Sequence, residues 1–181
     1  LLICRRETVA GVRIPVSPHK PLYINDLQGF FISLNMFSIK IDNSIIKEVS
    51  EIDIDLVFPH EKVIVNKKEI LKNNLKYKDD YVIISSIIIC METHMIIDGH
   101  HRYFALKELG IEKIPVTLIN YFSEKIKTDD NNSFSKNEII ENAKKGNLYE
   151  PKSTKHLIYC EKESKWVPIT LISALFNLKL N

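Results

Sequence analysis

Five consecutive residues, Asp98-Gly99-His100-His101-Arg102, carry the clearest chemistry in this chain. If a strand ends at Asp98-Gly99 and a helix starts at His100 or His101, the backbone amides of the first helical turn stay free, and such amides bind anions. Gly99 allows a close backbone approach that a side chain would block, and Arg102 offers a fork of donors matched to phosphate oxygens. The two histidines add donors, and Asp98 can hold a divalent cation. The segment therefore predicts a phosphate-binding turn.

Two other interpretations use parts of the same segment. Asp98 could only cap a helix, Gly99 could only serve a turn, and His101 could be an ordinary surface residue. A zinc site made from His94, His100 and His101 is a further alternative, but adjacent histidines at a helix start point in different directions. In addition, no Cys or carboxylate partner has metal-ligand spacing. We favour phosphate binding because every part of a phosphate cradle is present within five residues.

The elements that must position this turn are predicted by the hydrophobic pattern around it. Residues 81–89 are rich in β-branched side chains and are followed by a tight turn at 92–94 and a second apolar stretch at 95–97, which predicts strand, turn and strand. Residues 101–110 place apolar side chains on one face and end in glycine, which predicts a capped helix. Residues 114–119 then return as a strand.

The rest of the chain gives weaker patterns. Further elements are expected as strands at 37–41 and 51–57, helices at 63–76 and 136–145, a polar loop at 129–133 and an apolar helix or strand at 166–180. Residues 1–35 contain Pro15, Pro18 and Pro21, which interrupt regular structure. We interpret them as an N-terminal extension and expect the true start at Met36.

Length and composition limit the class of protein. With 181 residues, of which 45% are apolar and 27% charged, the chain can form one well-buried domain. The net charge of +2 leaves no basic excess for a nucleic-acid partner. No apolar stretch approaches the roughly 20 residues that span a bilayer. The three cysteines (Cys4, Cys90 and Cys160) form no CxxC pair, so we expect a cytoplasmic protein without a disulfide framework. From the charge and the apolar stretches we expect neither a nucleic-acid partner nor a membrane.

The sequence around the turn resembles a known family. Residues 86–110, together with Ile114-Pro115-Val116, look like the nucleotide-binding core of the ParB/sulfiredoxin superfamily, and the similarity is strongest to its free serine kinase branch. Three further segments support this branch: residues 53–61, the pair Asn120-Tyr121, and residues 150–156.

This resemblance implies a fold and a domain organisation. The fold would be α/β (α+β), with a mixed sheet, short helices and a nucleotide site at a strand-to-helix turn. The extension at 1–35 would be followed by a nucleotide-binding core at 36–125. A C-terminal helical segment at 126–181 would complete the substrate site.

The resemblance also implies an activity with named residues. Glu61 matches the catalytic carboxylate that accepts the proton of the serine hydroxyl, and Asp98 matches the aspartate near Mg2+ and the phosphates. The residues that match the phosphate-gripping turn are Gly99, His100, His101 and Arg102, and those that match the substrate site are His60, Lys152, Ser153, Thr154 and His156. The implied reaction transfers a phosphoryl group from ADP or ATP to free L-serine and gives O-phospho-L-serine, for cysteine biosynthesis.

The chain departs from the family pattern at two places. Ser86 stands where related sequences usually have proline. The stretch after Tyr121 lacks the tryptophan associated with substrate recognition in this branch, and residues 131–134 occupy that region. Selectivity for serine is therefore less firmly implied than nucleotide binding.

Other activities of the superfamily fit less well. A sulfiredoxin-type reductase would need a cysteine directly before the His-Arg of the turn, where this chain has His100. A DNA-binding relative would need a helix-turn-helix and a basic face after the core, and the residues after Asn120 contain no recognition-helix pair. The open alternative is a non-catalytic, nucleotide-dependent regulator in which Glu61 has no chemical role.

Overall fold

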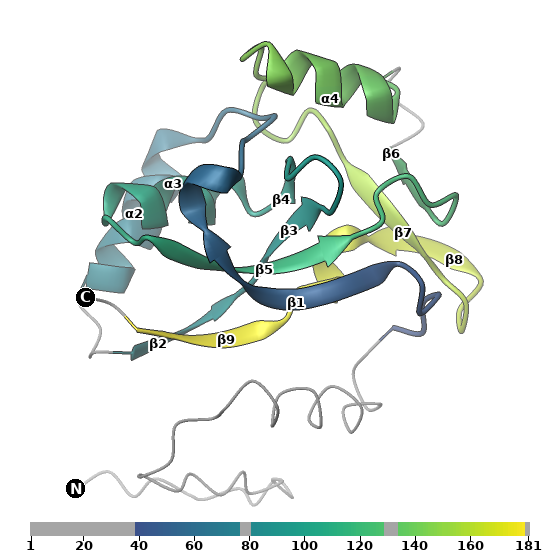
Figure 1. Cartoon of the computed structure of the whole chain (residues 1–181), viewed down its shortest axis with the longest axis horizontal. Coiled ribbons are helices and arrows are strands. Elements are labelled where there is room, and N and C mark those ends of the chain that lie inside the picture. Colours follow the sequence, from purple (N-terminus) through teal and green to yellow (C-terminus); the bar gives the residue numbers. More distant parts are fainter. Residues whose placement is uncertain (1–38, 77–80, 129–133, 180–181) are drawn as a thin grey trace, which may run out of the picture. The chain divides into compact units, whose positions relative to one another are not determined.

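A mixed sheet holds the predicted turn at its edge. The computed structural model describes residues 39–76, 81–128 and 134–179, which belong to one unit, Ser38–Asn181. Its four-stranded sheet has the order β1-β5-β3-β4 (Figure 1). Strand β3 (Ile87–Cys90) pairs in parallel with β5 (Lys113–Ile119), while β1 (Ile46–Asp53) and β4 (Ile96–Asp98) pair antiparallel with β5 and β3. Helix α3 (His100–Glu108) connects the edge strand β4 to β5.

The remaining elements surround this sheet. Helix α2 (Val65–Lys76) packs beside α3, and the short 3-10 helix η1 (Ile54–Leu56) follows β1 (Figure 1). Two smaller sheets complete the described residues. They are the antiparallel pair β2 (Tyr81–Ser85) and β9 (Leu175–Lys179), and the sheet β6 (Ile126–Thr128), β7 (His156–Cys160) and β8 (Lys165–Pro168), accompanied by α4 (Lys136–Lys144) and η2 (Ile169–Ile172).

Strand β3 is buried on both faces, which explains its uninterrupted apolar sequence. Successive side chains of a strand point to opposite sides of the sheet. Ile87 and Ile89 belong to a first core cluster, which includes side chains from α2, α3 and β9. Ile88 and Cys90 belong to a second cluster with side chains from α4 and β7. The strand that precedes the turn is therefore held between two cores.

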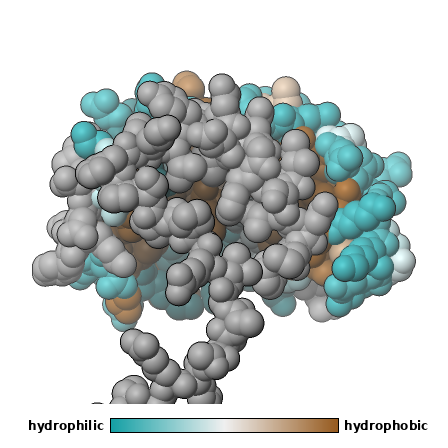
Figure 2. Space-filling model, turned by 90° about the horizontal axis from the view of Figure 1, so that it is seen from below, coloured by the Kyte–Doolittle hydropathy of each residue, from teal (hydrophilic) through white to brown (hydrophobic). Residues whose placement is uncertain are grey.

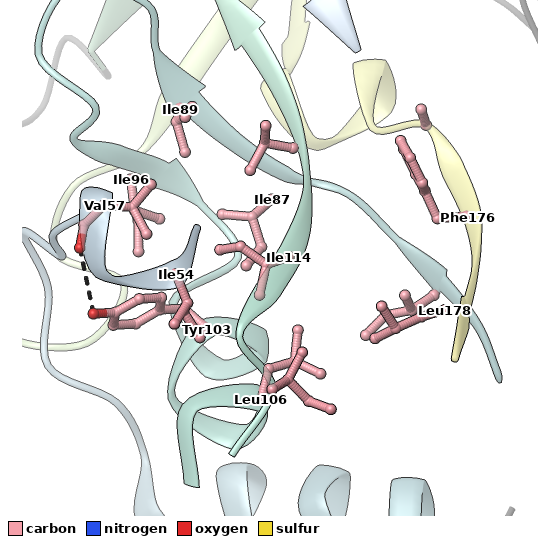
Figure 3. Close-up of a cluster of buried hydrophobic side chains, with 14 of the residues drawn as sticks. Ile54, Val57, Ile87, Ile89, Ile96, Tyr103, Leu106, Ile114, Phe176 and Leu178 are labelled. Carbon is pink, nitrogen blue, oxygen red and sulfur yellow. Dashed lines mark hydrogen bonds between the residues drawn. The ribbon is translucent and has the colours of Figure 1, made fainter. Parts of the chain in front are cut away.

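The first core cluster fixes the orientation of α3. Tyr103 and Leu106 of α3 belong to one cluster with Ile87 and Ile114 of the sheet and Phe176 of β9, and the Tyr103 ring lies beside Ile54 with its hydroxyl toward Val57 (Figure 3). The buried Tyr103 hydroxyl donates a hydrogen bond of 3.3 Å to the carbonyl oxygen of Val57 (Figure 3). Burial of an apolar side chain of this size contributes about 1.5–3 kcal/mol, so several such contacts anchor the helix that begins at the turn.

The outward face of the β2–β9 pair carries three exposed apolar side chains, Tyr81, Ile83 and Leu175, beside the exposed Asn177 and Lys179. Ile83 is 74% exposed and Leu175 is 63% exposed, whereas their neighbours Val82 and Phe176 are buried. Figure 2, a view from below Figure 1, shows apolar side chains in brown among hydrophilic ones in teal. Within the described residues, no helix has the length and apolar character needed to cross a membrane.

Most predicted elements around the turn are confirmed. The second apolar stretch at 95–97, the helix at 101–110 and the strand at 114–119 correspond to β4, α3 and β5, whereas the single strand predicted at 81–89 divides at Ser86 into β2 and β3, which belong to different sheets. The helices predicted at 63–76 and 136–145 correspond to α2 and α4. The α+β fold class with a mixed sheet is therefore confirmed. The loop predicted at 129–133, the expected start at Met36 and the extension at 1–35 lie outside the described residues.

Three predictions about secondary structure are wrong. Residues 39–41 form no strand, because Ile39 and Ile41 pack on the second core cluster from an irregular segment. The strand predicted at 51–57 ends at Asp53, whose carboxylate accepts a hydrogen bond from the Asp55 amide and so starts η1. The segment 126–181 is not mainly helical: its described part has one α-helix, one 3-10 helix and four strands.

Candidate functional site

The turn between β4 and α3 has the backbone geometry that the sequence predicts. Gly99 adopts a φ of 105° and stands as the N-cap of α3 without a side-chain cap. A Cβ at this position would lie 3.1 Å from Nη2 of Arg102 and 3.2 Å from Cγ1 of Ile87. Only glycine combines this φ with such close neighbours. Among the described residues, no acceptor bonds to the backbone amides of His100, His101 or Arg102.

The guanidinium of Arg102 is largely committed to the protein. Its Nη1 donates to the carbonyl oxygens of Ser85 and Ser86, at 2.8 Å each, and to the Ser85 hydroxyl. Its Nη2 donates to Oδ2 of Asp98 at 2.8 Å. Burial raises the pKa of Asp98, and the charge of Arg102 opposes that shift. Arg102 therefore ties the turn to the β2–β3 junction, and only part of its fork can reach a phosphate.

Glu61 lies beside this turn although it is distant in sequence. The backbone amide of Thr154 donates to Oε1 at 2.8 Å, the amide of Lys152 donates to Oε2 at 3.1 Å, and the Thr154 hydroxyl also donates to Oε1. An isolated bridge pairs Glu61 with Tyr149, so residues 149–154 run next to 60–62. The side chain of Glu61 is thereby held in one orientation by three donors.

These groups line one pocket of about 240 Å³. Its lining residues come from three segments of the chain and are Glu61, Asp98, Gly99, His100, His101, Arg102 and Lys152. The structure thus brings together both predicted catalytic carboxylates, all four predicted phosphate-binding residues and one predicted substrate-binding residue.

The other predicted substrate-binding residues do not line the pocket. His60, Thr154 and His156 are buried behind it, and Ser153 is partly buried. Nε2 of His156 forms a hydrogen bond of 2.8 Å with the Tyr121 hydroxyl. Their predicted contacts with substrate remain predictions.

The histidines at the site are kept neutral by burial. Nε2 of His100 accepts a hydrogen bond from the His60 amide at 3.3 Å, so this nitrogen carries no hydrogen. Burial holds the pKa of His100 well below its ordinary value, and it lowers the pKa of His156 to about 3. Nε2 of His101 likewise accepts from the Ile64 amide at 3.1 Å. His100 and His101 can therefore offer Nδ1–H groups without charge.

Lys67 of α2 is a neighbour of the site that sequence reasoning missed. The nearby ammonium of Lys152 lowers the pKa of Lys67. Burial lowers the pKa of His101, and the charges of Lys67 and Lys152 lower it further. These three basic groups gather beside the pocket, where their mutual repulsion favours an anionic ligand. No sequence signal singles out Lys67, because α2 is rich in lysine.

Ser86, which stands where related sequences usually have proline, forms several buried hydrogen bonds. Its amide donates to the carbonyl oxygen of Ala174 at 2.7 Å, and its hydroxyl accepts from the Ala174 amide at 2.9 Å. The hydroxyl also shares a hydrogen bond of 2.7 Å with Thr117. A proline could form none of these bonds.

The described residues contain no group of three or more His, Cys, Asp and Glu side chains that could hold a metal ion. His94, the third histidine considered for zinc, lies in the β3–β4 turn with a φ of 59° and does not line the pocket. Asp98 is one carboxylate at the pocket, which suits an ion such as Mg2+ that keeps waters and phosphate oxygens as its other ligands.

The fold agrees with that of a solved free serine kinase. A free serine kinase in complex with AMP superposes with a TM-score of 0.59 and 14% identity, over 80% of this chain and 96% of that one. At this identity the likeness shows the fold.

Curated relatives match part of the sequence, whereas no family model matches. An ATP-dependent L-serine kinase of Staphylothermus marinus is 36% identical over 78 residues, which are 42% of this chain and 31% of that protein. A ParB-like protein of Sulfolobus acidocaldarius is 38% identical over 68 residues, covering 38% and 33% of the two chains. An ADP-dependent L-serine kinase of Thermococcus kodakarensis is 26% identical over 102 residues, covering 54% and 42%.

These likenesses confirm the resemblance to ParB-like proteins and to serine kinases of that fold. The matched segment spans only about a third of the length of the first two relatives.

Proposed function

We propose that this protein is a kinase that transfers a phosphoryl group from ADP or ATP to the hydroxyl of free L-serine. One observation carries the proposal: the Glu61 carboxylate and the free amides at the start of α3 line the same pocket. A base and an anion-binding helix end are what phosphoryl transfer to an alcohol requires, since catalysis rests on positioning and charge stabilisation. The similarity to ATP-dependent and ADP-dependent L-serine kinases supports both the substrate and the class of donor.

The proposed roles follow from the positions of the groups. The amides of His100, His101 and Arg102 would bind the terminal phosphate oxygens, and Lys152 would add positive charge. Glu61 would accept the proton of the serine hydroxyl, which contributes on the order of 100- to 10,000-fold when a side chain acts as general base.

Asp98 would hold Mg2+ as one carboxylate ligand of a metal–nucleotide complex. A bound Mg2+ would neutralise charge on the phosphate oxygens. Arg102 remains paired with Asp98 and keeps its carboxylate oriented toward the turn. We further propose that residues 36–125 form the nucleotide-binding core and that 126–181 complete the site, which the contacts of Lys152 and Thr154 with Glu61 support.

A direct assay tests the activity. The purified full chain is mixed with L-serine, Mg2+ and either ADP or ATP, and O-phosphoserine is measured by mass spectrometry. L-alanine, which lacks the hydroxyl, serves as the matched control for nucleotide hydrolysis. Product from either nucleotide supports the kinase and identifies the donor, whereas bound nucleotide without product from either supports the non-catalytic regulator.

A cytoplasmic location and a role in cysteine biosynthesis remain predictions from the sequence. Cys90 and Cys160 are free thiols in the described part of the chain, which fits a reducing compartment.

A further inference from the structure

Two buried side chains line up behind Glu61, on the side away from the pocket. Oγ1 of Thr154 contacts Oε1 of Glu61. The Thr154 Oγ1 atom also lies 2.7 Å from Nε2 of His60. Nδ1 of His60 lies 2.5 Å from the carbonyl oxygen of Ile96. His60 is fully buried and Thr154 is 8% exposed, and neither lines the pocket. The three side chains form one chain of hydrogen bonds.

The number of hydrogens in this chain can be counted. A carbonyl oxygen only accepts, so Nδ1 of His60 must carry the hydrogen that it shares with Ile96. The Thr154 hydroxyl has one hydrogen, yet its oxygen is within bonding distance of both Nε2 of His60 and Oε1 of Glu61. Both contacts are satisfied only when a second hydrogen is present, on Nε2 or on Oε1.

The two placements differ in charge. With the second hydrogen on Oε1, Glu61 is a neutral acid and His60 a neutral imidazole. In the change to the second placement, the hydrogen on Oε1 of Glu61 moves to Oγ1 of Thr154, which breaks the Glu61 O–H bond. At the same time the original hydrogen of the Thr154 hydroxyl moves to Nε2 of His60 and forms an N–H bond there. The result is a Glu61 carboxylate and a His60 imidazolium, with no hydrogen lost or gained. Only this second arrangement leaves Glu61 able to act as a base.

The surroundings of His60 lower its pKa, so an imidazolium at this position depends on a negative charge nearby. The titratable rings packed against it are His100 of α3, with ring centroids 4.5 Å apart, and His156 of β7, at 5.4 Å. Burial keeps both of these rings neutral near pH 7. Burial also lowers the pKa of His60, and the Ile96 hydrogen bond and the charge of Glu61 oppose that shift. The Glu61 carboxylate is thus the negative charge that would stabilise a His60 imidazolium.

We propose that His60 and Thr154 are positioning residues of Glu61: His60 holds the second hydrogen of the chain, and Thr154 transmits its effect, so that Glu61 stays an anion. This inference rests on the proposed function for its kinetic meaning. The hydrogen-bond chain itself can be tested without turnover. It also gives His60 and Thr154 a role other than the substrate contact expected from the family resemblance.

The first test is nuclear magnetic resonance of the full chain with 15N-labelled histidine, in the absence of nucleotide. The Nε2 shift of His60 is followed against pH in the wild type, in Glu61→Gln and in Thr154→Val. We expect the midpoint of His60 protonation to fall by at least about one pH unit in both variants. Glu61→Gln removes the carboxylate, and Thr154→Val removes the hydroxyl that connects it to His60. Tyr103→Phe, which removes a buried hydroxyl of α3 outside the chain, should leave the midpoint unchanged.

The second test is the pH profile of serine phosphorylation. In Thr154→Val and in His60→Gln the acid limb of kcat should move by about one pH unit, because each variant breaks the hydrogen-bond chain that connects His60 to Glu61. Thr154→Ser retains a hydroxyl and should restore the wild-type profile. A structural role alone would change the amount of folded protein and would not move the limb.

The outcomes separate this inference from the proposed function. If the wild type phosphorylates serine but the protonation midpoint of His60 is the same in Glu61→Gln as in the wild type, the hydrogen-bond chain is refuted and the proposed kinase activity is supported. If the midpoint shifts but no O-phosphoserine forms, the kinase is refuted and the coupling of His60 to Glu61 stands. Because Thr154→Val tests the link at a less buried position, the result does not depend on whether His60→Gln folds.

Discussion

The backbone amide of Lys152 donates a hydrogen bond of 3.1 Å to Oε2 of Glu61, across a separation of 91 residues in the sequence. The candidate base is therefore oriented by a segment that is distant from it in the sequence. The turn between β4 and α3 is built from residues adjacent in the sequence, whereas the Glu61 carboxylate in the same pocket is held by long-range contacts. This difference determines which variants should affect binding and which should affect turnover.

Glu61→Gln should abolish turnover and spare nucleotide binding. The amide has nearly the shape of the carboxylate, but it cannot take a proton from an alcohol. We expect O-phosphoserine formation to fall by about 100- to 10,000-fold, with the nucleotide Kd from calorimetry within about 3-fold of wild type. Glu150→Gln, which changes an exposed carboxylate paired with Lys62, is the matched control. A Glu61→Gln rate near that of wild type would remove Glu61 from the mechanism.

Gly99→Ala should weaken both the fold and nucleotide binding. The new Cβ would be strained at a φ of 105° and crowded by Arg102 and Ile87. We expect a loss of about 1–3 kcal/mol in the free energy of unfolding and a Kd raised by at least about 10-fold. Gly110→Ala, at the other end of α3, has a φ of 74° but open space around its Cβ. It should lose stability by backbone strain alone and keep the wild-type Kd; equal effects on Kd would contradict the role of Gly99.

Ser86→Pro should destabilise the protein even though proline is usual at this position in related sequences. The substitution removes the amide that donates to Ala174 and the hydroxyl bonds to Ala174 and Thr117. Urea unfolding should show a loss of about 2–4 kcal/mol. Ser86→Ala keeps the amide and should lose about half as much. A proline variant as stable as wild type would show that these bonds contribute little.

Stability should decrease in mild acid because His100 and His156 are buried as neutral rings. In the unfolded chain each histidine takes up a proton below about pH 6.5, whereas in the folded protein the pKa of His100 is well below that value and that of His156 is about 3. The unfolded state therefore binds more protons as the pH falls from 6.5. The free energy of unfolding should drop by about 1.4 kcal/mol per pH unit for each histidine.

Urea unfolding at pH 7.5, 6 and 5 measures this slope. His156→Gln should remove the share of one histidine from the slope. A free energy of unfolding that is flat between pH 7 and 5 would show that these rings are protonated in the folded state.

The sequence predicts the turn well because its determinants are contiguous. The apolar stretch that forms β4, the glycine at Gly99 and the apolar face of α3 each follow local rules of secondary structure. The position of Glu61 beside the turn came from the family resemblance and not from any local pattern. The commitment of Arg102 to Ser85 and Ser86 could not be predicted, since it depends on where the strand 81–89 divides into β2 and β3.

Strands β6 and β7 were missed for a related reason, whereas the helix or strand expected at 166–180 corresponds to β8, η2 and β9. His156, Ile158 and Cys160 are buried at every second position of β7, a period-two pattern that marks a strand. Their pattern is short, and its partners β6 and β8 are only three and four residues long. Lys67 reaches the site only because α2 packs beside α3, which periodicity does not reveal.

The pairing of β2 with β9 has a consequence for how the protein is made. Phe176 and Leu178 of β9 complete the core cluster against which α3 packs, and their partners in β2 precede them by about ninety residues. Contacts between such distant segments form late in folding. A ribosome-bound chain would therefore carry an incompletely supported helix α3 until β9 leaves the exit tunnel, so the turn that begins this helix should reach its final packing only after residue 179 has emerged.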